Sequence, residues 1–240
     1  MSRSQAYMIQ ISRFRELNEF FEHTIDRSPQ DRYILSLPFK DNIASIGNNE
    51  GLVGSRLCSF IRKLKKNPAQ LAAVDQEIQI YLDRGYAEEA YPIHEGQLAD
   101  FLPLQAVFKT DQDNKIVKTR VIKDAGARRS HELSLNDCLH QGENLLPNVL
   151  KVLCTFRTGG YAITADIEKT FLQFEIAESN RTFLRFLWPL AISGNPGAQI
   201  KQFWSRVLDF GLICSPWLHI KGVRHHLENA KISSRNSLNS

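Results

Sequence analysis

Ile163-Thr-Ala-Asp166-Ile-Glu-Lys-Thr-Phe171-Leu-Gln-Phe174 is the stretch of this 240-residue chain that decides its fold and its chemistry. Residues 161–166 form a short, largely apolar run, which is typical of a β-strand. We expect this strand to end at the carboxylate of Asp166, with the ring of Phe171 following five positions later. A carboxylate fixed at a strand end can hold a catalytic metal, and the backbone carbonyl of Ile167 can reach the same ion. Taken alone, the pattern is more typical of a half-buried strand whose aspartate caps the next turn.

The composition indicates a folded, soluble chain. Hydrophobic residues make up 42% and charged residues 23%, so a disordered protein is not expected. The net charge of +4 is compatible with a polyanionic partner. The four cysteines show no CxxC spacing, which favours free, buried thiols in a reducing compartment. No signal peptide or membrane span is apparent, because the longest uncharged stretch, 186–200, is interrupted by proline and glycine. We therefore expect an intracellular, cytoplasmic protein.

The periodicity of apolar residues divides the chain into three regions. Residues 1–90 are expected to be mainly helical, with a loop at 42–54, because apolar side chains recur there at helical spacing. Residues 91–228 alternate between strands and helices, and include a strand at 182–188. Residues 229–240 are rich in Ser and Asn, which predicts a disordered tail. The apolar residues that define the early helices are Phe14, Leu17, Phe21, Leu57, Phe60, Ile61, Leu64, Leu71, Val74, Ile78 and Tyr81.

A basic β-hairpin is predicted in the middle of the chain. Strands at 104–109 and 117–122 flank a polar turn, and the run 109–129 contains seven basic residues against three acids. Arg120 lies on the second strand, and Lys109, Lys115 or Lys118 lies on or near the same hairpin. Arginine and lysine presented together suit a triphosphate, because arginine binds it bidentately and lysine acts as a point charge. An ordinary exposed hairpin with lysines along its edge explains the same pattern.

A third segment, 210–216, begins with Phe210 and Gly211 and ends with Ser215-Pro216. Gly211 permits a close approach of another backbone, and Ser215-Pro216 is a typical helix start. The helical character of 217–227 supports this start. By itself, the segment is no more than a loop that leads into a helix.

The order and spacing of these three elements resemble the reverse transcriptase domain of retroelements, in particular the polymerase of Pao/BEL-type long-terminal-repeat retrotransposons. The similarity extends over residues 14–228, nearly the whole chain. The sequence segments that are similar to this family are Tyr33-Ile-Leu-Ser-Leu-Pro-Phe-Lys40, Arg120-Val-Ile-Lys-Asp-Ala125, Ser134-Leu-Asn-Asp-Cys-Leu139, Asn144-Leu-Leu-Pro147, Thr164-Ala-Asp-Ile-Glu-Lys169, Phe183-Leu-Arg-Phe-Leu-Trp188 and Arg224-His-His-Leu-Glu228.

The resemblance implies an α+β fold: N-terminal helices, followed by the fingers and part of the palm of a right-hand polymerase. It implies RNA-directed DNA polymerisation, with Mg²⁺, deoxynucleotides and an RNA or DNA template-primer. By this resemblance Asp166 and the Ile167 carbonyl bind the metal, and Phe171 lies against the nucleotide sugar. Arg120 contacts the triphosphate, with Lys109 or Lys115 as its companion. Phe210 and Gly211 line the nucleotide.

The chain departs from the family in one respect that bears on activity. Family members complete the metal site with an aromatic-x-Asp-Asp motif, and no Asp-Asp pair occurs in this sequence. Glu168, Glu175 and Asp209 are the candidate substitutes. Our hypothesis is therefore a polyprotein fragment, truncated before that motif and catalytically incomplete by itself.

Two other interpretations remain open. The first is a non-catalytic nucleic-acid-binding remnant that uses the basic hairpin 109–129. The second is a chain that does not fold stably, in which Phe183, Phe186 and Trp188 are exposed. Other chemistry is disfavoured: Cys214, His219, His225 and His226 have no familiar zinc spacing, and there is no nucleophile elbow and no P-loop. Oligomeric state is left open.

Overall fold

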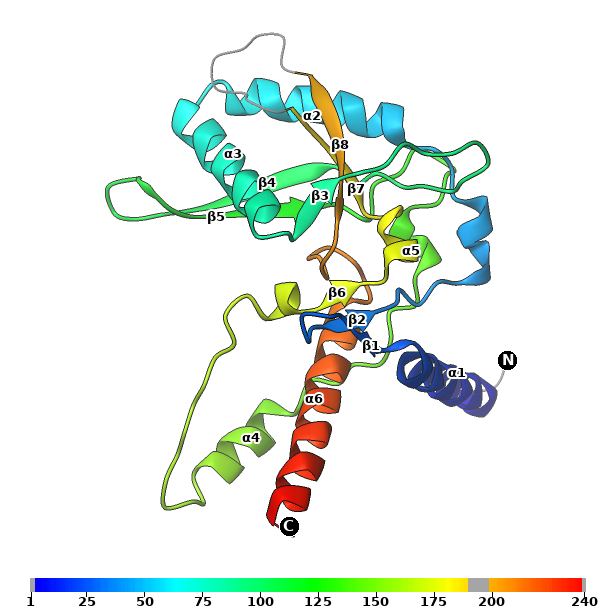
Figure 1. Ribbon diagram of the computed structural model, residues 1–240, viewed down its shortest axis with the longest axis vertical. Helices are drawn as coiled ribbons and strands as arrows, with labels where there is room; N and C mark the ends of the chain where they lie inside the picture. The colour runs from blue at the N-terminus through cyan, green and yellow to red at the C-terminus, as the bar shows by residue number, and fades with distance from the viewer. Residues whose placement is uncertain (1–2, 190–198, 239–240) are drawn as a thin grey trace.

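The computed structural model describes residues 3–189 and 199–238, which form a mixed α+β fold (Figure 1). The α-helices are α1 (Arg3–Thr24), α2 (Glu50–Leu64), α3 (Pro68–Asp83), α4 (Val149–Phe156), α5 (Glu178–Arg181) and α6 (Ser215–Leu238). Short 3₁₀ helices are η1 (Asp41–Ser45), η2 (Leu135–Cys138) and η3 (Thr170–Gln173). The strands are β1 (Asp26–Arg27), β2 (Tyr33–Leu35), β3 (Ala87–Glu89), β4 (Leu104–Thr110), β5 (Ile116–Lys123), β6 (Glu175–Ile176), β7 (Arg185–Pro189) and β8 (Ile200–Ser205). The expected α+β class is confirmed.

The strands form three small sheets. One has the order β1-β2-β6, with β2 and β6 parallel, and a second has the order β3-β8-β7, with antiparallel neighbours. The third is the two-stranded hairpin β4-β5, which extends from the body of the molecule (Figure 1). The hairpin is the sheet that the turn residues predict. Its turn is stabilised by the Asp111 carboxylate, which accepts hydrogen bonds from the backbone N–H groups of Asp113 and Lys115.

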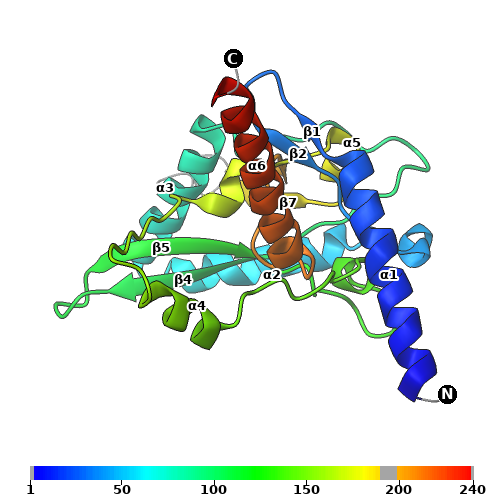
Figure 2. The same ribbon diagram turned by 90° about the horizontal axis from the view of Figure 1, so that it is seen from below.

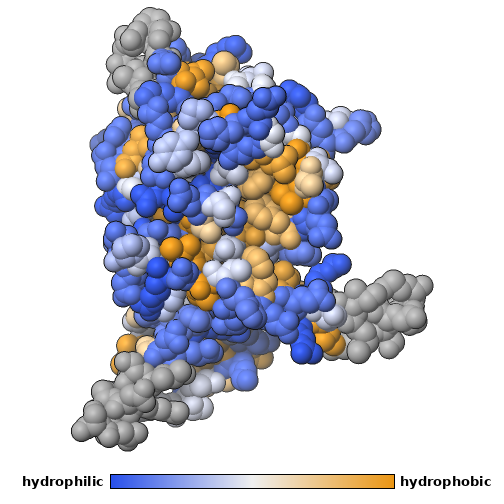
Figure 3. Space-filling model, turned by 45° about the vertical axis from the view of Figure 1, so that its right-hand side comes forward, coloured by the Kyte–Doolittle hydropathy of each residue, from blue (hydrophilic) through white to orange (hydrophobic). Residues whose placement is uncertain are grey.

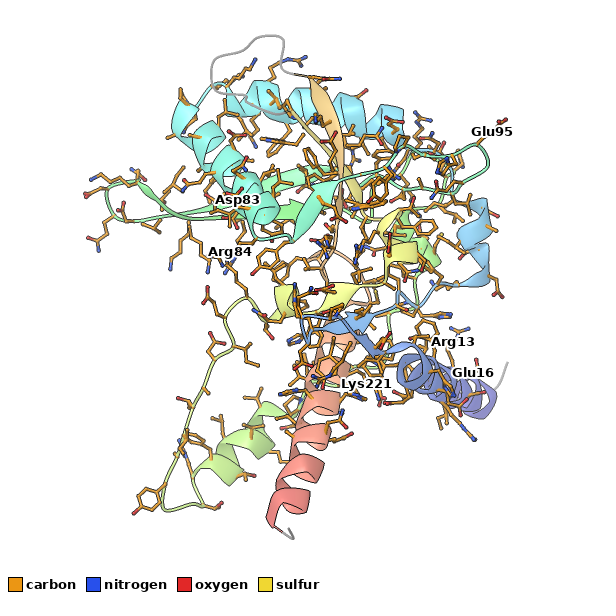
Figure 4. The ribbon with its side chains drawn as sticks, viewed as in Figure 1. Arg13, Glu16, Asp83, Arg84, Glu95 and Lys221 are labelled. Atoms are coloured by element: carbon orange, nitrogen blue, oxygen red, sulfur yellow. The ribbon has the colours of Figure 1, made fainter. Side chains whose placement is uncertain are left out.

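Two hydrophobic cores hold these elements together. The first combines α1, β2, η2 and the beginning of α6, and the second combines α2 and α3 with β4, β7 and β8. Figure 2 shows α1 and α6 from the side on which they cover the first core. The contact between these two helices includes Lys221, labelled in Figure 4, whose ammonium lies 3.2 Å from the Glu22 carboxylate. Both cores contain residues from before and after residue 90, so neither core is confined to one side of that position.

Phe183, Phe186 and Trp188 are all buried, so the prediction that they are exposed is wrong. Trp188 lies in the second core, and its indole N–H donates to the Asp75 carboxylate at 3.0 Å. The helices before β7 thus cover the apolar face that the sequence suggested was open.

The boundary between α2 and α3 follows the local sequence. The Asn67 side chain accepts a hydrogen bond from the backbone N–H of Gln70, and Pro68 occupies the first turn of α3. Gly85 follows α3 with a φ of 66°, the left-handed conformation that commonly ends a helix. The loop predicted at 42–54 is only partly correct. Helix α2 already begins at Glu50, because burial of Val53 outweighs the cost of the two glycines of its first turns.

The strand predicted at 161–166 does not form. Residues 161–167 have no regular secondary structure and are exposed, with Ile163 89% accessible. No strand lies beside them in the described part of the chain, and an isolated extended segment leaves its backbone groups unpaired by protein. This segment and α4 stand away from the two cores (Figure 1). The predicted tail also differs, because α6 continues as helix through Leu238.

The surface is mainly hydrophilic, with a band of apolar side chains across the face shown in Figure 3. Within residues 3–189 and 199–238, no helix has both the length and the apolar character needed to cross a bilayer. All four cysteines are free, but only Cys138 and Cys214 are buried. The prediction of buried thiols is therefore wrong for Cys58 and Cys154.

The buried carboxyl group of Asp100 predicts a pH dependence of stability. Its side chain is buried, and burial raises the pKa of Asp100 to about 8. The unfolded carboxyl has a pKa near 3.9, so the folded state holds the proton more tightly. The contribution of this carboxyl to stability is therefore largest below about pH 4 and is lost as the pH rises through about 8. We expect the free energy of unfolding of Asp100→Asn, measured by urea titration, to exceed that of the wild type by at least ~2 kcal/mol at pH 9. At pH 4 the two proteins should differ little. Equal pH dependence in both proteins would contradict this assignment.

Candidate functional site

The basic hairpin presents three cations on one exposed face. Residues opposite each other in an antiparallel pair share a face, and side chains alternate between faces along each strand. Val107 lies opposite Arg120, and Lys109 lies opposite Lys118. Lys109, Lys118 and Arg120 therefore share one face of the hairpin, and all three are exposed. Side chains ending in nitrogen project from the hairpin in Figure 4.

The pair Lys109–Lys118 favours an anionic partner. Two like charges directly opposite each other destabilise a strand pair, and a bound phosphate would relieve that repulsion. Neither lysine forms an ion pair within the described residues. Lys115 lies in the turn, outside the paired residues, and lines a groove beside α3 that Lys118 also borders. Of the two lysines that the sequence left open, the structure places Lys109 on the same face as Arg120.

Phe171 and Phe210 are brought together, although 39 positions separate them in the sequence. Their ring centroids lie 4.7 Å apart, with an interplanar angle of 43°. The Phe171 ring also stacks on His219, at 4.4 Å and 16°. The Thr170 hydroxyl lies 2.7 Å from Nε2 of the same histidine. Burial lowers the pKa of His219, so its ring is neutral at neutral pH. Phe171 thus contacts two rings, and Phe210 remains 47% exposed.

A buried ion pair joins the hairpin to the segment that contains Phe210. Lys123, the last residue of β5, donates to the Asp209 carboxylate at 2.7 Å and to the Ser205 hydroxyl at 2.6 Å. The side chains of both charged residues are 5% exposed. The ammonium also lies 4.9 Å from the centre of the Phe186 ring. A buried pair of this kind fixes relative position, because separating its partners leaves an uncompensated charge.

Gly211 completes the same junction. Its φ is 109°, and a Cβ atom at this position would lie 2.1 Å from the carbonyl oxygen of Lys123. The Asn136 side chain donates to the Gly211 carbonyl at 3.0 Å and accepts from the Ile213 backbone N–H at 2.8 Å. The close approach that the sequence suggested for Gly211 is therefore an approach to the backbone of β5.

Asp166 lies in the exposed segment 161–167, and its carboxylate has no hydrogen-bond or ion-pair partner among the described residues. Ile167 is 54% exposed. Mg²⁺ in proteins needs near-octahedral oxygen coordination, usually from more than one carboxylate or from substrate phosphates. Nowhere in residues 3–189 and 199–238 do three acidic, histidine or cysteine side chains converge on one point. The residues around Asp166 therefore do not fit a Mg²⁺ site by themselves.

Two of the three candidate substitutes for the missing acids form ion pairs with basic residues. The Asp209 carboxylate pairs with Lys123, and Glu175 lies 3.3 Å from the Arg32 guanidinium with 7% of its side chain exposed. Glu168 is exposed, in the same irregular segment as Asp166. None of the three supplies a second carboxylate beside Asp166.

Sequence reasoning missed Thr170 and His219 as partners of Phe171. The sequence pattern did not single out Thr170, and His219 was considered only as a disfavoured zinc ligand. Helical spacing places His219 one turn after Ser215-Pro216, close to the start of α6, which is the signal that a sequence reader could have used.

A scan of the chain against models of protein families finds no match, and neither does a search of curated proteins.

Proposed function

We propose that this chain is the fingers region and part of the palm of an RNA-directed DNA polymerase of the Pao/BEL retrotransposon type. The observation that carries the proposal is the contact between Phe171 and Phe210, two rings that the family resemblance assigns to one nucleotide site. The Lys109–Lys118 pair beside Arg120 provides a place for phosphate groups. The pair Lys123–Asp209 connects the strand of Arg120 to the segment of Phe210.

The same proposal holds that the 240 residues do not catalyse polymerisation by themselves. Asp166 is a single exposed carboxylate, whereas in-line nucleotidyl transfer needs two metal ions held about 4 Å apart by several oxygens. Asp166 and the Ile167 carbonyl would contribute to such a site only together with further carboxylates.

Primer extension tests this proposal directly. We expect the purified chain, with a primed RNA template, deoxynucleotides and Mg²⁺, to extend no primer above the level of Asp166→Ala. It should still bind a fluorescent deoxynucleoside triphosphate, and Arg120→Ala should weaken that binding about tenfold through loss of a charge-assisted contact. Arg62→Ala, which removes an exposed arginine from α2, serves as the matched control.

Extension that Asp166→Ala abolishes would show a complete polymerase and contradict the inactive state. Triphosphate binding that responds equally to Arg120→Ala and Arg62→Ala would contradict the nucleotide site.

The alternative is a non-catalytic nucleic-acid-binding protein that uses the hairpin within 109–129. The shared exposed face of Lys109, Lys118 and Arg120 favours it. Phosphate contacts release counterions, so binding of a single-stranded oligonucleotide should weaken steeply with salt. Replacing the three cations by alanine should reduce the slope of log K against log [salt] by about 2.

The control is the triple alanine variant at Lys63, Lys65 and Lys66, which removes the same charge from the end of α2. Fluorescence anisotropy at several salt concentrations measures both slopes. Equal slopes for the two variants would show that the hairpin face is not the binding surface.

A further inference from the structure

A groove of about 820 Å³ runs between α3 and β5. On one side lie the small residues Ala69, Ala72 and Ala73 of α3, and on the other lies the β5 side of the hairpin. Ile80 and Ile116 contribute apolar surface within it. The alanines lack long side chains, so a second backbone can approach α3 closely along this groove.

The edge of β5 that faces away from β4 has no strand partner among the described residues. Along such an edge, alternate residues point their backbone N–H and C=O groups outward, and these groups are available to another strand. The part of β5 and its turn that lines the groove spans 115–119, a length of about 17 Å in extended conformation. That length matches an ordinary β-strand.

The charge of the groove is positive. Lys115, Lys118 and Lys169 line it, against one acid, Glu77. None of these three lysines forms an ion pair in the part of the chain that the structure describes. Lys169 adopts a φ of 50°, a left-handed conformation that costs a non-glycine residue about 1 kcal/mol. Among the residues that the structure describes, no aromatic side chain lines the groove, so these residues offer no surface on which nucleic-acid bases would stack.

We propose that this groove binds an extended peptide segment with acidic side chains, which adds to β5 as a third strand. Backbone hydrogen bonds to the free edge supply affinity, and the three lysines select acidic side chains on the incoming strand. The groove shares Lys118 with the exposed face of the hairpin but includes neither Arg120 nor Lys109, so the inference does not depend on the proposed polymerase function.

The test uses the full chain and a synthetic hexapeptide of alternating Glu and Val, labelled for fluorescence anisotropy. We expect saturable binding and slower hydrogen exchange of the backbone amides at 115–119. Lys115→Glu with Lys169→Glu should weaken binding about tenfold. The matched control, Lys65→Glu with Lys66→Glu, reverses the same charge at the end of α2 and should leave binding within about twofold.

A second variant separates shape from charge. Ala72→Trp fills the groove from the exposed face of α3 without changing its charge, and it should also abolish binding. A hexapeptide N-methylated at alternate residues cannot complete the strand ladder and should not bind. Equal binding of the methylated peptide, or protection at 115–119 by an oligothymidylate but not by the acidic peptide, would overturn the proposal. Absence of any peptide binding would overturn it as well.

Discussion

Lys123→Met is expected to lower the free energy of unfolding by about 4 kcal/mol, as measured by urea denaturation at neutral pH. The substitution removes the ammonium that Asp209 and Ser205 both contact, while the Asp209 carboxylate stays buried. One Asp209 oxygen already lacks a hydrogen-bond partner among the described residues, so the remaining carboxylate would have little to stabilise its charge.

A double variant shows whether the effect comes from the pair. Lys123→Met with Asp209→Leu removes both charges and replaces them by apolar side chains, and it should recover most of the lost stability. Lys118→Met, on the exposed face of the same strand, is the control and should change stability by less than about 0.5 kcal/mol. A double variant no more stable than Lys123→Met alone would show that the ion pair is not the cause.

Gly211→Ala is expected to lower the free energy of unfolding by about 3 kcal/mol, through two separate effects. Alanine disfavours the φ of 109°, and its Cβ would lie 2.1 Å from the Lys123 carbonyl oxygen. That neighbour is backbone, so it cannot move away as a flexible side chain can. The junction between β5 and Phe210 must therefore open to admit the methyl group.

Gly96→Ala separates the two effects. Gly96 has a φ of 78°, and a Cβ there meets no atom within 4 Å, so only the conformational cost of about 1 kcal/mol applies. Urea titrations of both variants measure the difference. Equal losses would show that the contact with Lys123 contributes nothing.

The elements that were predicted correctly depend on nearby residues. The hairpin β4-β5 follows from a polar turn between two apolar runs, and the helices α2 and α3 follow from the spacing of apolar residues between Leu57 and Tyr81. The strand at 161–166 failed for the opposite reason. A strand needs a partner that local sequence does not reveal, and the described residues place none beside Tyr161 or Ile163.

In the candidate site, too, the sequence predicted some contacts and not others. The contact of Phe171 with Phe210 agrees with the grouping implied by the family resemblance, whereas periodicity alone would not have paired them. The pair Lys123–Asp209 spans 86 positions and was not predicted, because nothing in the neighbourhood of either residue marks it. Asp166, the residue on which the sequence argument began, makes no contact that the structure records with Arg120 or Phe210.

The interleaving of the two cores has a consequence for cooperativity. The chain supplies the first core from 17–46, 102–139, 174–184 and 208–218, and the second from 53–104, 186–188 and Phe203. Each core is therefore closed only after the chain has passed through the other. A cut at residue 90 separates α1 and β2 from the rest of the first core and α2 and α3 from the rest of the second, so we expect the two cores to unfold in one transition.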